Sequence, residues 1–143
     1  MNMFMLFVKG EPVAQGRPRF STIGGHTRAI DPAKSREFKQ IIAVMARQKM
    51  EQEGMGLMEG PLSLEVRVYR IPPKSMGKKR SADAIEKKRG IVTKPDLDNY
   101  IKLVSDAING VVFADDSQIV AIRATKRYSD VPGIEITVAG EEE

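Results

Sequence analysis

Hydrophobic and polar residues alternate most clearly in segment 62–69, where every second residue is Leu or Val. A period of two predicts a β-strand with one buried face. Shorter apolar runs predict further strands at 3–8, 119–128 and 134–138. Because only the turn-forming segment 129–133 separates the last two, we expect them to form an antiparallel hairpin.

A first helix is predicted after Asp31-Pro32, because an N-cap residue followed by Pro is a preferred helix start. Apolar residues with helical spacing continue to about Gly54, which should end the helix. These residues, which should face a sheet, are Phe38, Ile41, Ile42, Met45 and Ala46.

A second helix is predicted from residue 97 to about Asn109, with Gly110 as its stop. Its expected core stripe consists of Leu97, Ile101, Val104 and Ile108. Asp98, Lys102 and Asp106 follow one another at intervals of four and therefore share a different face of this helix.

Two segments lack a clear periodicity. Residues 10–30 form a long predicted loop in which Arg17 and Arg19 bracket Pro18. Proline holds such a segment extended, so the two guanidinium groups could grip phosphates, although an ordinary surface loop has the same composition. Residues 81–89 could form a short helix within a segment that we expect to be mobile without a partner.

This order of elements, β-α-β-α-β-β, has no repeating βαβ rhythm. It predicts an α+β fold of two layers, in which helices pack on one face of a mixed β-sheet. With 143 residues and no internal repeat or linker, the chain should form one domain over residues 1–143.

The composition restricts the chemistry that is available. The chain has no Cys and a single histidine, His26, so thiolate metal sites, thiol nucleophiles and His-rich sites are excluded. Carboxylates and lysines must therefore do any chemistry. The apolar run 1–8 is too short to span a membrane and has no basic leader, so we expect a cytoplasmic protein with no membrane partner.

The net charge of +4 is unevenly distributed. We call residues 74–94 the basic segment; it holds eight basic and two acidic residues, a surplus of six positive charges, within a loop predicted at 72–94. The basic residues are Lys74, Lys78, Lys79, Arg80, Lys87, Lys88, Arg89 and Lys94. Such a field attracts polyphosphate backbones, although a solvated loop without a partner is an equally good interpretation of the charge alone. The tail 141–143 is acidic.

Five aspartates and one lysine in the block 96–116 suit a magnesium site. Magnesium prefers hard oxygen ligands, and Asp96 before the helix can converge with Asp98 in its first turn. A short connection after the helix could return Asp115 and Asp116 toward its start, and Lys102 could reach a phosphate or an attacking water. Separately, each aspartate could instead be a cap or turn residue, and Lys102 and Asp106 a surface pair.

The run Asp96-Leu97-Asp98-Asn99, with Lys102, Asp106, Gly110 and the later Asp115-Asp116 followed by Ile119-Val120, resembles the signature of RusA-type Holliday-junction resolvases. The segment Gln15-Gly16-Arg17-Pro18-Arg19 is similar to the N-terminal part of one branch of that family. The resemblance implies a homodimer that nicks four-way junction DNA symmetrically, using Mg²⁺ or Mn²⁺. It further implies that Asp96, Asp98 and Asp116 form the acidic site, with Asp115 as a lesser metal ligand and Lys102 assisting.

The chain departs from that pattern at two places. Tyr100 stands where an aliphatic residue is frequent, and Lys94-Pro95 replaces an arginine run, the charge being displaced into the basic segment. Another class of nucleases has a Pro-Asp motif followed by a strand that carries Asp or Glu, then any residue, then Lys. Pro95-Asp96 is present here, but no such triplet follows it, so this class is disfavoured. The alternatives left open are a non-catalytic module that binds branched DNA and a metal-dependent phosphatase for small molecules.

Overall fold

A computed structural model describes residues 3–17, 19–30 and 32–141, except for the side chains of 19–21, 23, 26 and 28–30. Its four-stranded sheet has the strand order β1-β6-β4-β5. The strands are β1 (Met3–Lys9), β4 (Leu62–Arg70), β5 (Ile119–Tyr128) and β6 (Gly133–Gly140). Because β4 and β5 are parallel and the other pairs antiparallel, the sheet is mixed, as predicted.

The predicted hairpin of the last two strands is wrong. β6 pairs with β1 on one side and β4 on the other, so β4 lies between β5 and β6. The turn 129–132 crosses the end of β4, where the Ser129 amide donates to the Arg70 carbonyl at 2.9 Å. Strand β4 has its alternating Leu and Val side chains buried on the helix-facing side, and it lies in the interior of the sheet with its backbone paired on both edges.

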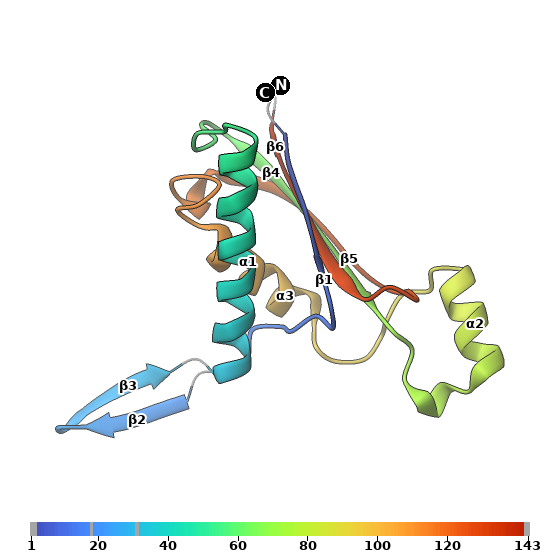
Figure 1. Cartoon of the computed structure of the whole chain (residues 1–143). Coiled ribbons are helices and arrows are strands. Elements are labelled where there is room, and N and C mark those ends of the chain that lie inside the picture. The colour runs from blue at the N-terminus through green and yellow to red at the C-terminus, as the bar shows by residue number, and fades with distance from the viewer. Residues whose placement is uncertain (1–2, 18, 31, 142–143) are drawn as a thin grey trace.

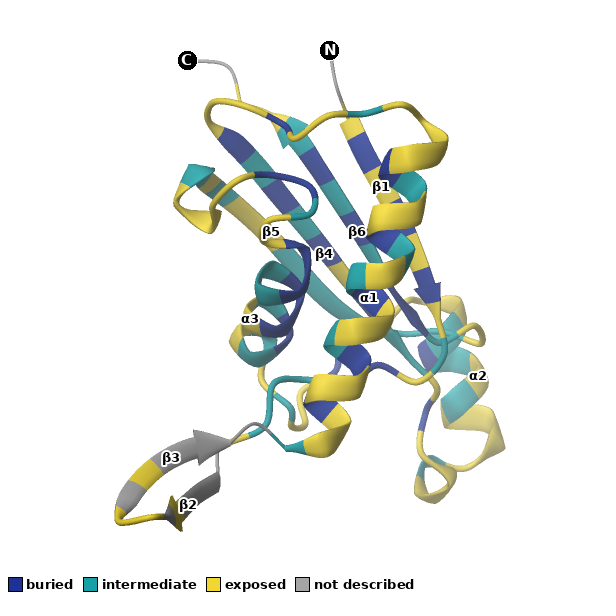
Figure 2. Ribbon diagram, turned by 60° about the vertical axis from the view of Figure 1, so that its left-hand side comes forward, coloured by how far each residue is buried: buried dark blue, intermediate teal, exposed yellow. Residues whose placement is uncertain are grey.

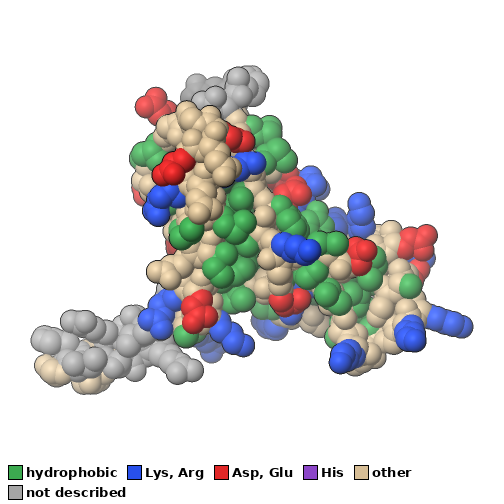
Figure 3. Space-filling view, in the orientation of Figure 1, with side chains coloured by type: hydrophobic (Ala, Val, Ile, Leu, Met, Phe, Trp, Pro, Cys, Tyr) green, Lys and Arg blue, Asp and Glu red, His purple; other side chains and the backbone are tan. Residues whose placement is uncertain are grey.

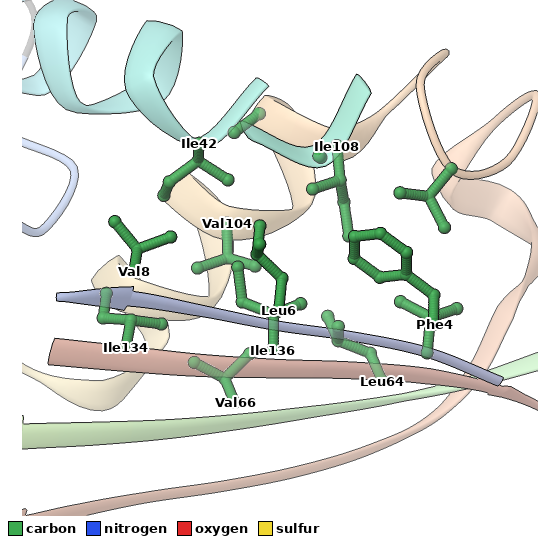
Figure 4. Close-up of a cluster of buried hydrophobic side chains, with 14 of the residues drawn as sticks. Phe4, Leu6, Val8, Ile42, Leu64, Val66, Val104, Ile108, Ile134 and Ile136 are labelled. Carbon is green, nitrogen blue, oxygen red and sulfur yellow. The ribbon is translucent and has the colours of Figure 1, made fainter. Parts of the chain in front are cut away.

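Two long helices cover one face of the sheet (Figures 1 and 2). They are α1 (Ala33–Gln52) and α3 (Leu97–Ile108), and the core lies between them and the strands. Figure 4 shows inward side chains of the sheet meeting Ile42 of α1 and Val104 and Ile108 of α3. The two-layer α+β architecture is therefore confirmed. Asp31, the predicted cap of α1, lies outside the described residues.

The predicted core stripes are partly wrong. On α3, Val104 and Ile108 are buried, but Tyr100, Leu103 and Ala107 take the remaining core positions, while Leu97 and Ile101 are only half-buried. On α1, Ile41 is 50% exposed, whereas Ser35 and Met50 are buried. Both stripes are rotated because each helix packs against the sheet and also against the other helix, so its buried arc extends toward that helix.

Residues 10–30 are not one irregular loop. Their second half forms a two-stranded hairpin of β2 (Arg19–Ile23) and β3 (His26–Ile30), joined at Gly24-Gly25. Both glycines have positive φ, 61° and 83°, which a two-residue hairpin turn needs and glycine adopts without strain. The Gly-Gly pair was the signal for this turn in the sequence.

The basic segment is an insertion between β4 and α3, and it is folded. It contains a 3₁₀ turn, η1 (Lys74–Met76), and the helix α2 (Lys78–Glu86). A second 3₁₀ turn, η2 (Asp116–Gln118), precedes β5. Figure 1 shows α2 and the β2–β3 hairpin projecting from the same end of the molecule on opposite sides, with α3 between them.

Candidate active site

The acidic motif begins α3 with its carboxylates turned to solvent. Asp96 occupies the N-cap position, but its side chain makes no capping hydrogen bond. Instead, Lys94 Nζ lies 3.0 Å from Asp96 Oδ2, and Asp98 is exposed in the first turn. A purely capping role therefore does not account for either aspartate.

The position of this motif is set by contacts to distant parts of the chain. Lys126 on β5 donates from Nζ to the carbonyl oxygens of Thr93 and Pro95, at 2.8 and 2.9 Å. On the other side, the Gln15 amide donates to the Asn99 carbonyl at 3.0 Å. Asp96 thus lies beside the C-terminal part of β5, although it is far from that strand in sequence.

A basic hollow of about 370 Å³ adjoins the motif. It lies between the loop 15–17, α1 and α3, and its lining includes Arg17, Lys39, Lys102 and Asn99. Lys102 Nζ is 3.7 Å from Asp106 Oδ2 and its side chain is 65% exposed, so it can turn toward a ligand. Three cations, with Asp106 as a carboxylate in the same lining, surround an open hollow that can admit a phosphate group.

A buried hydroxyl, that of Ser35, also holds the loop that lines this hollow. Ser35 is 2% exposed; its Oγ accepts from the Gly16 amide at 2.9 Å and donates to the Ala14 carbonyl at 3.2 Å. A Cβ on Gly16 would lie 2.7 Å from Pro32 Cγ, which explains the glycine. Arg17 is therefore positioned by α1, whereas Pro18 and the Arg19 side chain lie outside what the structure describes.

Sequence reasoning missed Lys39, Gln15 and Asn99 as parts of this hollow. Lys39 follows Ser35 by one helical turn, so helical spacing alone places it near whatever Ser35 holds. The missing knowledge was that Ser35 binds the N-terminal loop, which no local pattern reveals.

The second pair of aspartates lies at the other end of α3, which corrects the expected return of the chain. The connection stays at the end of the helix, because the Gly110 amide donates to the Phe113 carbonyl and the Ala114 amide to Gln118 Oε1. Twelve helical residues separate the two ends, a length of about 18 Å. The strand gives a similar measure, since Lys126 lies about 23 Å along β5 from Ile119.

The two members of this second pair differ. Asp115 caps η2 in a capping box with Gln118, and a hydrogen bond from the Ser117 hydroxyl lowers the pKa of Asp115. Asp116 is exposed beside it. Among the residues that the structure describes, no three Asp, Glu or His side chains lie close enough to hold a metal ion. One chain therefore divides the predicted metal ligands between two places.

The basic segment presents most of its charge at the tip of the α2 projection (Figure 3). Asp83 binds two of its cations, Lys87 Nζ and Arg89 Nη2, both at 2.9 Å, and these contacts lower the pKa of Asp83. Within the described part of the chain, no ion pair engages the remaining exposed cations of the projection, which are Lys74, Lys78, Lys79, Arg80 and Lys88. They are available to an anionic partner.

Tyr100, the departure noted in the motif, is explained by the core. Its ring is fully buried at the start of α3, and its hydroxyl makes no hydrogen bond of good geometry. Burial raises the pKa of Tyr100, and the nearby Arg70 guanidinium opposes that shift. Arg70 is itself bound to Glu11 at 3.0 Å. The tyrosine therefore packs in the core next to the acidic motif, and it does not line the basic hollow.

Exposed carboxylates beside an open basic hollow, together with a cationic projection at the same end of the molecule, define a domain suited to act on nucleic-acid backbones. The family model for endodeoxyribonuclease RusA matches residues 9–139. The chain therefore belongs to the RusA endodeoxyribonuclease family, as the resemblance predicted. It is also 43% identical over 140 residues, 96% of each chain, to the uncharacterized protein YqaN of Bacillus subtilis (strain 168). No described helix is long and apolar enough to cross a membrane.

Proposed function

We propose that this protein resolves Holliday junctions by symmetric phosphodiester hydrolysis as a Mg²⁺-dependent homodimer, with Mn²⁺ able to substitute. The observation that carries the proposal is a pair of exposed carboxylates, Asp96 and Asp98, that lie beside the basic hollow at a helix start without a side-chain capping hydrogen bond. A module that only binds DNA has no use for carboxylates next to its phosphate site, because they repel the backbone.

Each part of the site has a distinct task in this proposal. Arg17, Lys39 and Lys102 bind the phosphate and stabilise the charge that develops on it during hydrolysis. The carboxylates of Asp96, Asp98 and Asp116, with Asp115 as a lesser candidate, are the oxygen ligands that Mg²⁺ prefers. The donor set suits the ion, although one chain does not bring it together.

The branched substrate would be gripped from two sides. The cations of α2 and the loop carrying Arg17 lie at the same end of the molecule as the start of α3, and they would contribute most of the affinity through phosphate contacts. A four-way junction has near two-fold symmetry, so two equivalent subunits suit it.

A nicking assay tests this function. A labelled four-way junction and a matched linear duplex are incubated with wild type, Asp98→Asn and the control Glu51→Gln, in Mg²⁺ and in EDTA. Glu51 is an exposed carboxylate at the far end of α1. We expect paired symmetric nicks on the junction alone, lost in Asp98→Asn and in EDTA and retained in the control. Junction binding without cleavage in every protein would instead favour a non-catalytic module.

A further inference from the structure

Two further hollows lie where the basic segment meets the C-terminal ends of β4 and β5. We call the larger, of about 440 Å³, the apolar hollow, and the smaller, of about 280 Å³, the α2 hollow. Tyr128, the last residue of β5, lines both, so the two hollows adjoin. Neither shares a lining residue with the basic hollow beside α3.

Tyr128 is fixed by backbone pairing on two sides. It pairs with Arg70 of β4, and its amide donates to the Arg89 carbonyl of the basic segment at 3.0 Å. Because side chains alternate along a strand, its ring lies on the same side of the sheet as Lys126, two residues earlier. The side chain is half-buried. A ring held in this way, with part of its surface open, is a platform on which a flat ligand can stack.

The apolar hollow combines nonpolar walls with a few polar groups. Arg70, Glu11 and Thr93 supply hydrogen-bond donors and acceptors, and Arg70 Nε donates to Glu11 Oε1 at 3.0 Å. A nucleobase has two apolar faces and a polar edge, so an aromatic wall and a small polar set suit it. The nonpolar part of the lining consists of Ile71, Pro73 and Ile91.

The α2 hollow carries the charge that the apolar hollow lacks. Its lining includes Arg80, Arg89 and Asp83. Asp83 is bound by Arg89 Nη2 and by Lys87 Nζ, both at 2.9 Å, so these four residues together retain two positive charges. Within the described part of the chain, Arg80 is engaged by no ion pair. A phosphate next to the Tyr128 ring would therefore be attracted here.

We propose that the two hollows bind one unpaired nucleotide of the branched DNA, with its base stacked on Tyr128 in the apolar hollow and its phosphate bound at Arg80 in the α2 hollow. This inference rests on the proposed function and names a part of the substrate that the function leaves open. A base that is stacked in a duplex exposes only its edges, so its face reaches Tyr128 only after the base has left the helix.

The hollows lie close to the acidic motif. Thr93 lines the apolar hollow, and Asp96 follows it by three residues, which span at most about 11 Å. Lys126 holds the connection in place through the carbonyls of Thr93 and Pro95. One strand of DNA can therefore contact Tyr128 and Asp96 together. The bound nucleotide is then a near neighbour of the phosphodiester that is cleaved.

This arrangement supplies a basis for selecting branched over linear DNA. Opening a base pair costs free energy, and the cost is smallest where pairing or stacking is already interrupted. A branch point offers such an interruption, whereas an intact duplex does not. Stacking on Tyr128 would therefore stabilise the complex with a branch more than the complex with a duplex.

Junction binding in EDTA tests the proposal without any cleavage. Fluorescence anisotropy measures the affinity for three forms of one four-way junction: fully paired, with a single mismatch beside the crossing point, and with an abasic residue in place of one mismatched base. The changed position is moved through the pairs that flank the crossing point, on each strand in turn. At one position we expect wild type to bind the mismatched form roughly 5- to 100-fold more tightly than the abasic form.

Variants of the tyrosine identify its role. Tyr128→Leu keeps an apolar side chain but removes the ring, and it should bind the mismatched and abasic forms equally. Tyr128→Phe should retain the wild-type difference, because stacking needs only the ring. Tyr69→Leu is the matched control, since Tyr69 is a strand tyrosine on the opposite face of the sheet. An unchanged difference in Tyr128→Leu overturns the proposal.

Arg80→Gln examines the phosphate contact separately. All three junctions keep their phosphates, so this variant should weaken the three by the same factor. A loss confined to the mismatched form would contradict the placing of the phosphate at Arg80.

Crosslinking of the wild-type protein serves should Tyr128→Leu not fold. Junctions that carry 5-iodouracil at the position found by anisotropy are irradiated, and the crosslinked residue is located by mass spectrometry. We expect a crosslink to Tyr128. A crosslink only to residues outside the two hollows, or none, overturns the proposal.

The binding measurements separate this inference from the proposed function. Wild type that nicks junctions in Mg²⁺ but binds the mismatched and abasic forms equally at every position would overturn the inference alone. Base-dependent binding that Tyr128→Leu abolishes, without nicks in any divalent cation, would defeat the function and uphold the nucleotide site.

Discussion

Replacing Ser35 by alanine should loosen the loop that carries Arg17. The single hydroxyl of Ser35 serves both the Gly16 amide and the Ala14 carbonyl, and the side chain is buried. Alanine leaves both backbone groups without their partner, and each unsatisfied buried group costs about 1–3 kcal/mol. Because the loop is only partly buried and water can replace part of the loss, we expect a total cost of about 2 kcal/mol.

For a chain of this length, that loss should lower Tm by roughly 6 °C. Thermal unfolding followed by circular dichroism at equal protein concentration measures it. Junction affinity, measured by fluorescence anisotropy, should fall together with Tm because Arg17 loses its fixed position. Gly16→Ala should weaken binding in the same way, since its Cβ would collide with the Pro32 ring.

The matched control is Ser105→Ala. Ser105 is also a helical serine, but its hydroxyl donates only to the Lys102 carbonyl within an exposed turn of α3. Its loss should change the free energy of unfolding by less than about 0.5 kcal/mol. Equal Tm values for the Ser35 and Ser105 variants would refute the claim that Ser35 holds the loop.

Three further outcomes are expected. Tyr100→Phe should be at least as stable as wild type, because it removes a buried hydroxyl that makes no hydrogen bond of good geometry, whereas Tyr100→Ala should cost about 3–5 kcal/mol. Since burial raises the pKa of Tyr100, its stabilising neutral form is fully present below pH ~10 and is lost above it; alkaline unfolding, followed by circular dichroism, should therefore begin at higher pH in Tyr100→Phe. Replacing the three cations at 78–80 by glutamine should reduce the slope of log affinity against log salt by up to about 0.9 per lost phosphate contact, while Arg47→Gln on α1 should leave it unchanged; an equal slope in both would remove α2 from the interface. Lys102→Met should lower the nicking rate roughly 100- to 1000-fold with a much smaller loss of junction binding, and parallel losses would make it a binding residue only.

Local patterns predicted the elements well and their pairing poorly. The alternation in 62–69 and the helix start at residue 97 rest on contacts within a few residues, so the sequence reveals them directly. The neighbours of β6 in the sheet depend instead on long-range pairing. They are β1 and β4, which come from distant parts of the chain. The short 129–132 turn suggested a hairpin because turn length alone cannot distinguish neighbouring strands from strands with one between them.

The candidate site was predicted in the same uneven way. Asp96, Asp98 and Lys102 lie within two helical turns, so their proximity follows from helix geometry. The place of Asp116 depends on the direction in which the chain leaves α3, and the parallel pairing of β4 with β5 sets that direction. Lys39 was missed because its role depends on a loop that Ser35 attaches to α1.

The attachment of Asp96 to β5 has a mechanical consequence. The carbonyl oxygens of Thr93 and Pro95 both accept hydrogen bonds from one lysine, Lys126, and segment 89–91 is hydrogen-bonded to the same strand. In the proposed complex, a pull exerted by DNA on α2 would reach Asp96 through this short connection at the C-terminal end of β5, without passing through the packed core. DNA binding at α2 and the placement of the Asp96 carboxylate would then be energetically coupled, and such a coupling is reciprocal. A substrate that binds α2 in the wrong position would leave the acidic residues of the protein misaligned with the phosphate. The connection would therefore act as a check on substrate shape.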